Sequence, residues 1–323
     1  MEKFSQFRDR GSGVSPFLPA LTPSSTASAI PRVFLFLFRV PIFLACAAVY
    51  FLILHHLPLP AVARKLLLWG LMGIPGIWWV DLQLDGVKRG ALSQQPASRV
   101  PHPRSIIAAN FTSPLDALYL AAVFDPIFTI SYPGSRKVRR IGLIQAMLLA
   151  LSPSQLSSTP SPGASGLTDL RALLKRHPNR VIAVFPECAT TNGKGILPLS
   201  PSLLTAPAET VIFPVSMRYT PPDVTTPVPG AWFTFLWKLL SRPTHCIRVR
   251  IAEGMHNTSV ATNGTSSLPS GSPAAEDDDA TPEERRVLDR VADALARLGR
   301  AKRVGLTIKD KNAFVEAWGK AGK

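Results

Sequence analysis

The longest apolar stretch of the chain lies near its N-terminus. Residues 33–54, VFLFLFRVPIFLACAAVYFLIL, form a run of 22 residues in which Arg39 is the one charge. A helix of this length rises ~33 Å, enough to cross the ~30 Å hydrocarbon layer of a membrane. A buried core helix is the alternative, but few soluble helices are apolar on every face. The run therefore predicts a membrane-inserted helix.

A second apolar stretch, LLLWGLMGIPGIWWV, follows at residues 66–80. It is interrupted by Gly73, Pro75 and Gly76, and it ends in two tryptophans, which are enriched at membrane–water interfaces. The stretch is too short to predict a second span. We therefore expect residues 33–80 to form either an inserted hairpin or a spanning helix followed by a segment on the membrane surface.

From residue 104 onward, short β-branched runs alternate with helix-like segments. This alternation is typical of an α/β domain, with a largely parallel sheet flanked by helices. We place the domain at residues 81–256. The predicted strands are residues 105–109, 127–131, 181–185, 211–215 and 247–251, and the predicted helices are residues 117–124, 142–151 and 167–177.

Three stretches rich in Ser, Pro and Gly lie outside these elements. Residues 1–32 predict a disordered leader, residues 152–165 a flexible loop and residues 257–280 a disordered insert, because their composition cannot bury an apolar face. Thr281 and Glu284 then form a capping box before an apolar stripe of helical period. We expect residues 281–323 to form a C-terminal helix and a tail that pack on the domain.

The formal charge of +15 indicates an anionic partner or surface. Residues 1–275 hold 25 lysines and arginines against 11 acidic residues, so the basic part of the chain is also its apolar part. Nucleic acid, acidic lipid headgroups and phosphorylated molecules such as coenzyme A would all match this charge. A nucleic-acid binder would need aromatic and basic residues interleaved on one face, and the sequence has no such face. Membrane phospholipid is therefore the expected partner, and nucleic acid is not.

Two polar turns follow predicted strands, where open α/β sheets bind their ligands. The first lies in IIAANFTSPLDALYL, residues 106–120, which leaves a strand at Asn110 and starts a helix near Asp116. The second lies in VIAVFPECATTNGKGILPL, residues 181–199, whose backbone N–H groups, hydroxyls and lysine could cradle a phosphate. Each also has a structural explanation: Asp116 is placed to cap a helix, and the second turn has the composition of an ordinary surface turn.

Together these segments resemble the phospholipid/glycerol acyltransferase family, whose first block reads N-H-x-x-x-x-D and whose third reads F-P-E-G-T-R. The corresponding strings here are NFTSPLD at residues 110–116 and FPECAT at residues 185–190. ISYPGSRKVRRIGLI, residues 130–144, is similar to the second block, and VIFPVSMRY, residues 211–219, to the fourth. The likeness is greatest to the fungal lysophosphatidic acid acyltransferase branch.

The resemblance implies a glycerolipid acyltransferase-like fold and a 1-acylglycerol-3-phosphate O-acyltransferase-like enzyme of glycerolipid synthesis or remodelling. Such an enzyme transfers an acyl group from acyl-CoA, its co-substrate, to lysophosphatidic acid or a similar lysophospholipid acceptor, with no metal and no other cofactor. The resemblance also implies a membrane location, on the endoplasmic reticulum or lipid droplets, with the catalytic domain facing the cytosol.

The resemblance further implies which residues form the site. Asp116 and Glu187 would be catalytic, with Glu187 helping to position the lysophospholipid. The substrate would be bound by residues of the blocks and of the second polar turn, namely Asn110, Ser113, Arg139, Thr190, Thr191, Asn192, Gly193 and Lys194.

Two positions depart from the family pattern. Phe111 stands where the family has the histidine that takes a proton from the acceptor hydroxyl, and Thr190 stands where it has an arginine. No histidine lies inside a block, although His102 and His245 are candidates for a substitute base. The candidates for a substitute cation are Lys194, Arg139, Arg140 and Arg218.

These departures leave a second interpretation open. An acyltransferase-fold protein that has lost catalysis could serve as a lipid-binding scaffold on the endoplasmic reticulum or lipid droplets. Cys188, beside Glu187, suggests a nucleophile, but no histidine accompanies it, and a small buried residue is the simpler explanation. A histidine nitrogen within ~2.6–3.2 Å of Asp116 would supply the missing base.

Overall fold

The structure is a computed structural model of the 323-residue chain. It describes residues 2–321 apart from residues 21, 23–28, 89, 153–165 and 260–279. Residues 153–165 of the expected flexible loop and residues 260–279 of the expected disordered insert lie outside the described residues, so these parts stay predictions. The prediction of disorder is wrong for residues 257–259, where Asn257 and Ser259 are buried.

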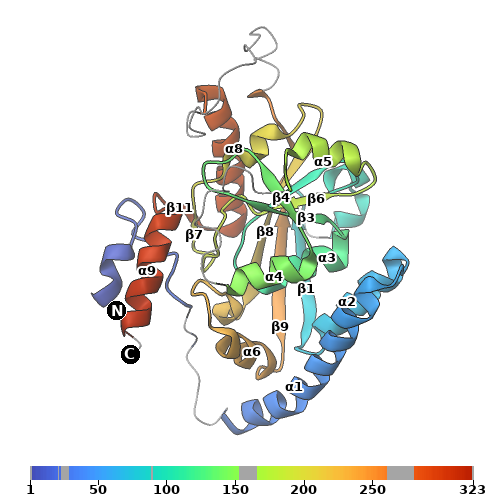
Figure 1. The fold of residues 1–323 in the computed structure, drawn as a ribbon, viewed down its shortest axis with the longest axis vertical. Coiled ribbons are helices and arrows are strands. Elements are labelled where there is room, and N and C mark those ends of the chain that lie inside the picture. The colour runs from blue at the N-terminus through green and yellow to red at the C-terminus, as the bar shows by residue number, and fades with distance from the viewer. Residues whose placement is uncertain are drawn as a thin grey trace.

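The centre of the protein is a mixed sheet (Figure 1). Its strands run in the order β1-β9-β8-β2-β6-β3-β4-β5, and β10 pairs with β8. Strands β8, β2, β6 and β3 are parallel to one another, which confirms the predicted largely parallel sheet. The strands are β1 Ile77–Leu84, β2 Ile106–Ala109, β3 Ile127–Ser131, β4 Val138–Ile141, β5 Leu167–Thr168, β6 Ile182–Val184, β8 Val211–Thr220, β9 His245–Ile251 and β10 Met255–His256, with β7 Gly195–Ile196 and β11 Lys302–Arg303 forming a separate pair.

Helices cover both faces of this sheet. Successive side chains of a strand point to opposite faces, so the buried residues of β2 and β8 fall into two clusters. Ile107 and Val215 pack in a cluster with α2, α3, α4 and α6, whereas Ile106 and Ile212 pack in another with α5 and α8. The helices are α1 Ala29–Leu52, α2 Ala61–Gly73, α3 Pro114–Phe124, α4 Leu143–Leu151, α5 Leu170–Arg176, α6 Trp232–Leu240, α8 Pro282–Gly299 and α9 Ile308–Ala321.

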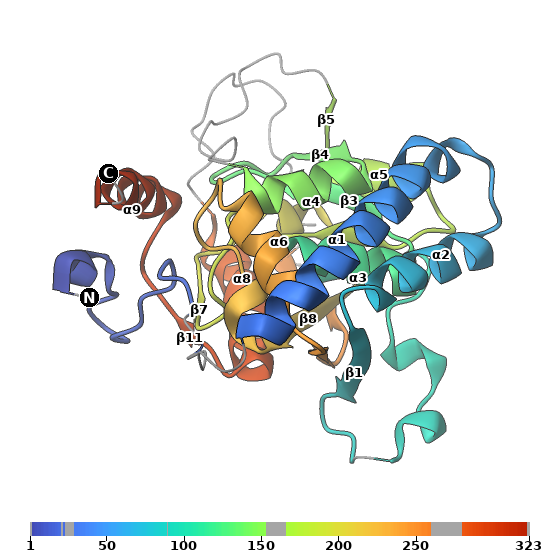
Figure 2. The same cartoon turned by 90° about the horizontal axis from the view of Figure 1, so that it is seen from below.

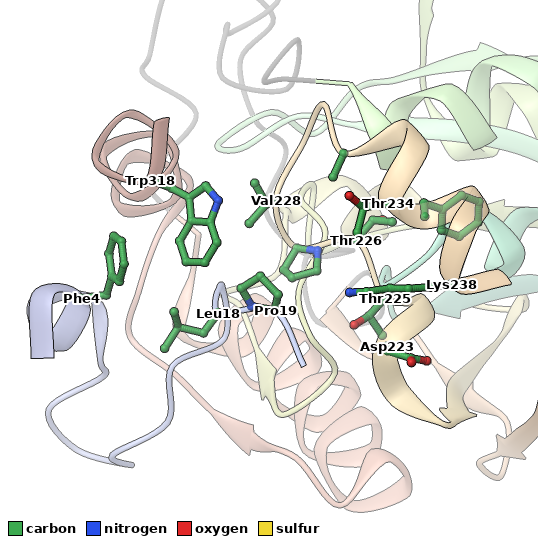
Figure 3. A pocket seen from close by; sticks show the side chains of 13 residues that line it. Phe4, Leu18, Pro19, Asp223, Thr225, Thr226, Val228, Thr234, Lys238 and Trp318 are labelled. Atoms are coloured by element: carbon green, nitrogen blue, oxygen red, sulfur yellow. The ribbon is translucent and has the colours of Figure 1, made fainter. Parts of the chain in front are cut away.

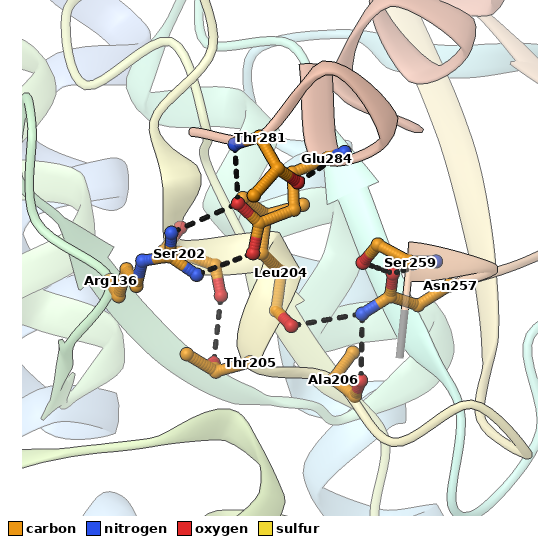
Figure 4. Close-up of polar contacts among 9 residues, drawn as sticks. All are labelled: Arg136, Ser202, Leu204, Thr205, Ala206, Asn257, Ser259, Thr281 and Glu284. Carbon is orange, nitrogen blue, oxygen red and sulfur yellow. Dashed lines mark hydrogen bonds and ion pairs between the residues drawn. The ribbon is translucent and has the colours of Figure 1, made fainter. Parts of the chain in front are cut away.

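Helix α8 begins at the predicted capping box (Figure 4). The Thr281 hydroxyl accepts a hydrogen bond from the Glu284 N–H, and the Thr281 N–H donates to the Glu284 carboxylate. Arg136 donates to both oxygens of the same carboxylate, at 2.6 and 3.0 Å. The Asn257 amide donates to the carbonyls of Leu204 and Ala206. These contacts fix the described residues on either side of residues 260–279.

Helix α1 is long and apolar enough to cross a membrane, judged by length and composition, with a mean hydropathy of 2.3 over its most apolar window. It does not stand away from the domain, however, and lies along α6 and α2 (Figure 2). The Phe36 ring packs on Trp237 at 4.8 Å between centroids. The Arg39 guanidinium donates to the backbone carbonyls of Pro75, Arg242 and Pro243, so the charge inside the apolar run holds α1 to the domain.

The second apolar stretch does not form a helix of its own. Residues 66–80 are divided between the end of α2 and the start of β1, because the Gly-Ile-Pro-Gly sequence between them ends the helix. Leu68, Leu71 and Met72 are buried against the domain. The prediction of a membrane helix or hairpin over residues 33–80 is therefore wrong for residues 77–80. These residues form the start of an edge strand, β1, which pairs with β9.

The two ends of the chain form a small unit of their own beside the sheet (Figure 1). The prediction of a disordered leader over residues 1–32 is wrong for residues 2–20, and residues 29–32 belong to α1. A short 3-10 helix spans Glu2–Phe7, and Phe7 and Phe17 are buried. Their partner is Phe314 of α9, which is 0% exposed and is surrounded by the rings of Phe4, Phe7, Phe17 and Trp318 at 5.3 to 5.9 Å.

We expect Phe314→Ala to release this terminal unit while the sheet stays folded. Deleting a fully buried phenylalanine side chain costs about 3–5 kcal/mol, and Phe314 is the ring that the N-terminal Phe4, Phe7 and Phe17 contact. Hydrogen–deuterium exchange should show faster amide exchange over residues 2–20 and α9, with no change in β2 and β8. Phe233→Ala, at an exposed ring of α6, is the matched control. Unchanged exchange in residues 2–20 would contradict the assignment.

Candidate active site

The first block begins where β2 ends, and Asn110 continues the sheet beyond the strand. The Asn110 side-chain amide donates to the Met217 carbonyl at 3.0 Å, and its oxygen accepts from the Met217 N–H at 2.8 Å. The Asn110 backbone N–H donates to the Val215 carbonyl. The side chain thus acts as a backbone mimic that ties β2 to β8. The predicted substrate contact of Asn110 gains no support from this arrangement.

Asp116 caps helix α3, as one of the two interpretations of the sequence predicts. Ser113 is the N-cap, and its hydroxyl accepts from the Leu115 N–H. The Asp116 carboxylate accepts hydrogen bonds from the backbone N–H groups of Thr112 and Ser113, at 2.6 and 2.9 Å. It also accepts from the Thr112 hydroxyl, at 3.1 Å, and from the hydroxyl of Tyr219 on β8. Asp116 therefore joins β2, α3 and β8.

The protonation of this carboxylate is set by its burial. Asp116 is 0% exposed, and burial raises its pKa to about 6, although the hydrogen bonds from Tyr219 and from the Thr112 and Ser113 N–H groups favour the charged form. Burial also raises the pKa of Tyr219 well above its usual range, so Tyr219 stays protonated and donates. A carboxylate with a pKa this close to neutrality can both take up and return a proton.

No histidine contacts Asp116 among the described residues. His102 Nδ1 lies against the Val100 carbonyl, and His245 Nε2 lies 2.8 Å from the Leu239 carbonyl. The two histidines considered as substitute bases are therefore not partners of Asp116. The residues that do orient it, Thr112 and Tyr219, were not among the predicted site residues, although each lies inside a block of the sequence.

Phe111, at the position of the family's histidine, is a packing residue. Its ring stacks on Phe185 at 4.6 Å between centroids, and only 3% of it is exposed. Its backbone N–H donates to a Glu187 oxygen at 3.3 Å, and its carbonyl accepts from the Thr191 N–H at 3.0 Å. Phe111 thus connects the first block to the third through both its ring and its backbone.

Glu187 connects the same two blocks. One carboxylate oxygen accepts from the Phe111 N–H and the other from the Leu197 N–H, at 3.3 and 3.1 Å. Burial raises the pKa of Glu187 to about 8, although these two backbone hydrogen bonds favour its charged form. Both oxygens are therefore used inside the protein, which favours a positioning role for Glu187.

The second polar turn is covered rather than open. The Asn192 side chain donates to the carbonyls of Ser15 and Leu18, and the Asn192 N–H donates to that of Pro16, all at 2.8 Å. Gly193 has a φ of +76° and packs close to the methyl group of Thr112. The N-terminal residues therefore occupy the place where the sequence predicts a phosphate cradle.

A cation does reach the third block, but from an unexpected part of the chain. Lys311 of α9 donates from Nζ to the carbonyl and the hydroxyl of Thr190, both at 2.8 Å, and it is buried. Burial lowers the pKa of Lys311 to about 7, while the nearby Glu187 favours its charged form. No local sequence motif identifies Lys311 as a partner of Thr190, because the two residues are 121 positions apart.

The four predicted substitute cations do not contact Thr190. Lys194 is exposed. Arg139 and Arg140 lie on β4, three strands away from β2 in the sheet. Arg218 follows Met217 and precedes Tyr219 on β8, so its side chain points to the face opposite Asp116.

Cys188 is buried beside Glu187, with Sγ 3.5 Å from the Pro186 carbonyl. Burial raises the pKa of the Cys188 thiol, which disfavours the reactive thiolate. The interpretation of Cys188 as a small buried residue is therefore the better one.

Two curated relatives are similar to the chain in sequence, whereas no family model matches it. A protein of Schizosaccharomyces pombe, provisionally named lysophosphatidic acid:oleoyl-CoA acyltransferase, is 27% identical over 329 residues, and the alignment covers 98% of each chain. Lysophosphatidic acid:oleoyl-CoA acyltransferase 1 of Saccharomyces cerevisiae is 25% identical over 208 residues, which are 62% of this chain and 61% of the relative.

Solved structures are also similar to the chain, and we report one of them. It is the 1-acyl-sn-glycerophosphate acyltransferase PlsC of Thermotoga maritima, at 18% identity and a TM-score of 0.43, with 84% of this chain and 96% of that chain covered. A likeness at this TM-score is too remote to support an inference.

We expect Tyr219→Phe to raise the pKa of Asp116 above its value of about 6. The Tyr219 hydrogen bond favours the carboxylate, so its loss makes the proton harder to remove. Carboxyl carbon NMR of aspartate-labelled protein, with Asp116→Asn to assign the signal, measures the titration. Tyr132→Phe is the control, because Tyr132 makes no contact with Asp116 among the described residues. An unchanged or lowered pKa would contradict the role given to Tyr219.

Proposed function

We propose that the chain belongs to the fungal branch of the glycerolipid acyltransferase family and that it transfers an acyl group from acyl-CoA to the free hydroxyl of lysophosphatidic acid or a similar lysophospholipid. The names of both curated relatives support these substrates. The observation that carries the proposal is the network around Asp116, which puts a buried carboxylate of near-neutral pKa at the end of β2.

Asp116 takes the place of the missing histidine as the final proton acceptor. Its carboxylate contacts are two backbone N–H groups, the Tyr219 hydroxyl and the Thr112 hydroxyl. Of these groups, the Thr112 hydroxyl is the one that we assign to the relay, because it donates to Asp116 and keeps lone pairs that can accept a proton from a substrate at the same time, whereas backbone N–H groups have no such acceptor. Thr112 therefore relays the proton.

The reaction then balances without a covalent acyl-enzyme, a metal or another cofactor. The acceptor hydroxyl passes its proton to Thr112 as Thr112 passes its own to Asp116. The acceptor oxygen forms a bond to the thioester carbon, and the carbon–sulfur bond breaks. The coenzyme A thiolate leaves and takes up the proton that returns from Asp116 through Thr112. Glu187 and Lys311 hold the third block in place beside this relay.

Substrates reach the relay only after a covering layer moves. Thr112 is 1% exposed, and its carbonyl accepts from the Thr226 N–H at 2.8 Å. Residues 222–228, together with the N-terminal residues bound to Asn192, form that layer. Of the predicted substrate contacts, Ser113, Thr190 and Thr191 lie beneath it and become available when it opens.

The enzyme works on a membrane surface with α1 lying in the interface. The guanidinium of Arg39 is bound to the domain, so α1 is held flat along α6 rather than free to cross the bilayer. The apolar side chains on this side are exposed and include aromatic residues suited to an interface. They are Phe34, Leu37, Phe38, Leu66, Trp78, Trp79, Trp232 and Phe233. Membrane phospholipid, on the endoplasmic reticulum or a lipid droplet, is the proposed surface.

We expect the wild-type protein to convert lysophosphatidic acid and labelled oleoyl-CoA to phosphatidic acid, and Asp116→Ala to lose about 10²–10⁴-fold of the rate, the range of a general base. The active form is the carboxylate, so activity should fall as pH drops through about 6. Phe111→His is the informative partner variant. No turnover by wild type, with turnover gained in Phe111→His, would instead favour the catalytically inactive lipid-binding scaffold, which the relatives do not support.

The relay itself is tested at Thr112. Thr112→Val keeps the shape of the side chain but removes the hydroxyl, so kcat should fall about as far as in Asp116→Ala. Thr112→Ser keeps the hydroxyl and should retain most of the activity. Thermal unfolding of the three proteins controls for stability. Equal kcat values for Thr112→Val and Thr112→Ser would show that Thr112 carries no proton.

A further inference from the structure

A cavity of about 460 Å³ lies between the N-terminal residues, α6 and α9, outside the blocks of the sequence (Figure 3). Its size falls in the ~300–1,000 Å³ range of small-molecule sites. Phe4, Leu18, Val228 and Trp318 line one side of it, and Figure 3 shows the Phe4 and Trp318 rings away from α6. This side of the cavity is apolar.

The other side carries charge. Lys238 of α6 extends toward Pro19 and Thr225 (Figure 3), and its amino group has no hydrogen-bond or ion-pair partner among the described residues. Asp223, which also lines the cavity, binds Arg242 and Thr22 through Oδ2. Its Oδ1 is buried and has no donor within the described part of the chain.

The cavity is separated from the proton relay by one stretch of backbone. Residues 224–226 lie between them: Thr225 and Thr226 line the cavity, while the Val224 carbonyl accepts from the Ser113 hydroxyl and the Thr226 N–H donates to the Thr112 carbonyl. The Thr226 carbonyl accepts from the Thr190 hydroxyl at 2.8 Å. The polar side of the cavity is therefore the side nearest to both catalytic blocks.

These features define the chemistry of an occupant. It needs an apolar chain for the side with Phe4 and Trp318, an anionic group for Lys238 and a small polar group for the side lined by Thr225, Thr226 and Thr234. A lysophospholipid has all three: one acyl chain, a phosphate and a free glycerol hydroxyl. Acyl-CoA fits less well, because its nucleotide and several phosphates would meet a single unpaired cation in this cavity.

We propose that this cavity is the binding site of the lysophospholipid acceptor, with the phosphate at Lys238 and the acyl chain between Leu18, Val228 and Trp318. The assignment rests on the proposed function but differs from the phosphate cradle expected at residues 190–195, which the N-terminal residues cover. The acceptor enters beside the exposed Trp232 and Phe233 of α6, on the side that faces the membrane.

The test is equilibrium binding of radiolabelled 1-oleoyl-lysophosphatidic acid to the full-length protein in detergent micelles, which requires no turnover. Lys238→Met should weaken binding at least about tenfold, whereas Lys238→Arg should stay within about threefold of wild type. Val228→Trp should abolish binding by filling the cavity, whereas Val228→Ala should keep it. Oleoylglycerol, which lacks the phosphate, should bind wild type and Lys238→Met equally.

The outcomes separate this assignment from the proposed function. Unchanged lysophosphatidic acid binding in both Lys238→Met and Val228→Trp would overturn the acceptor site, and so would a Val228→Trp effect confined to labelled oleoyl-CoA. Kinetics give the second readout: Lys238→Met should raise the KM for lysophosphatidic acid but leave that for oleoyl-CoA and kcat unchanged. If the protein binds lysophosphatidic acid in a Lys238-dependent way but shows no turnover, the proposed acceptor site stands and the proposed enzymatic function is wrong.

Discussion

The buried carboxylate of Asp116 is the interaction on which the rest of the site depends. It caps α3, fixes the turn at Thr112 and holds Tyr219 of β8, so three elements meet at one charge. Burial keeps its pKa near neutrality, and the donors around it keep the charged form accessible. The same contacts that stabilise the start of α3 thus prepare a proton acceptor. Asp116 can therefore cap α3 and accept a proton with the same carboxylate.

Two residues of the acyltransferase pattern, a histidine and an arginine, are absent from this chain. Other parts of the chain compensate for both. Phe111 replaces a base by an aromatic contact with Phe185 and by backbone bonds, which makes the first and third blocks a rigid pair. Thr190 replaces a cation, and Lys311 of α9 brings one to the same position. A packed ring therefore stands at the position of the missing histidine, and a buried lysine reaches the position of the missing arginine.

Local patterns in the sequence predicted the parts of the fold that local forces decide. Strands β2, β3, β6, β8 and β9, the capping box at Thr281 and the place of Asp116 at the start of α3 follow from spacing within about ten residues. Lys311 and the folded residues 2–20 could not be predicted in this way. Their contacts join positions 121 or more residues apart, as in the Lys302 to Ser12 hydrogen bond across 290 positions, and polar composition concealed the buried Phe7 and Phe17.

In the proposed mechanism, the terminal segments also couple substrate binding to the access of substrate to Thr112. Residues 15–18 hold Asn192 of the third block, and Leu18 and Pro19 line the cavity beside α6. The loop that contains Thr226, whose N–H donates to the Thr112 carbonyl, forms another wall of the same cavity. A ligand there contacts both segments that must move before a hydroxyl reaches Thr112. If it binds the open arrangement more tightly, it shifts the population toward that arrangement. A domain limited to residues 81–256 would lack Leu18, Pro19 and Lys311, so both chain ends are part of the folded unit that forms the candidate site.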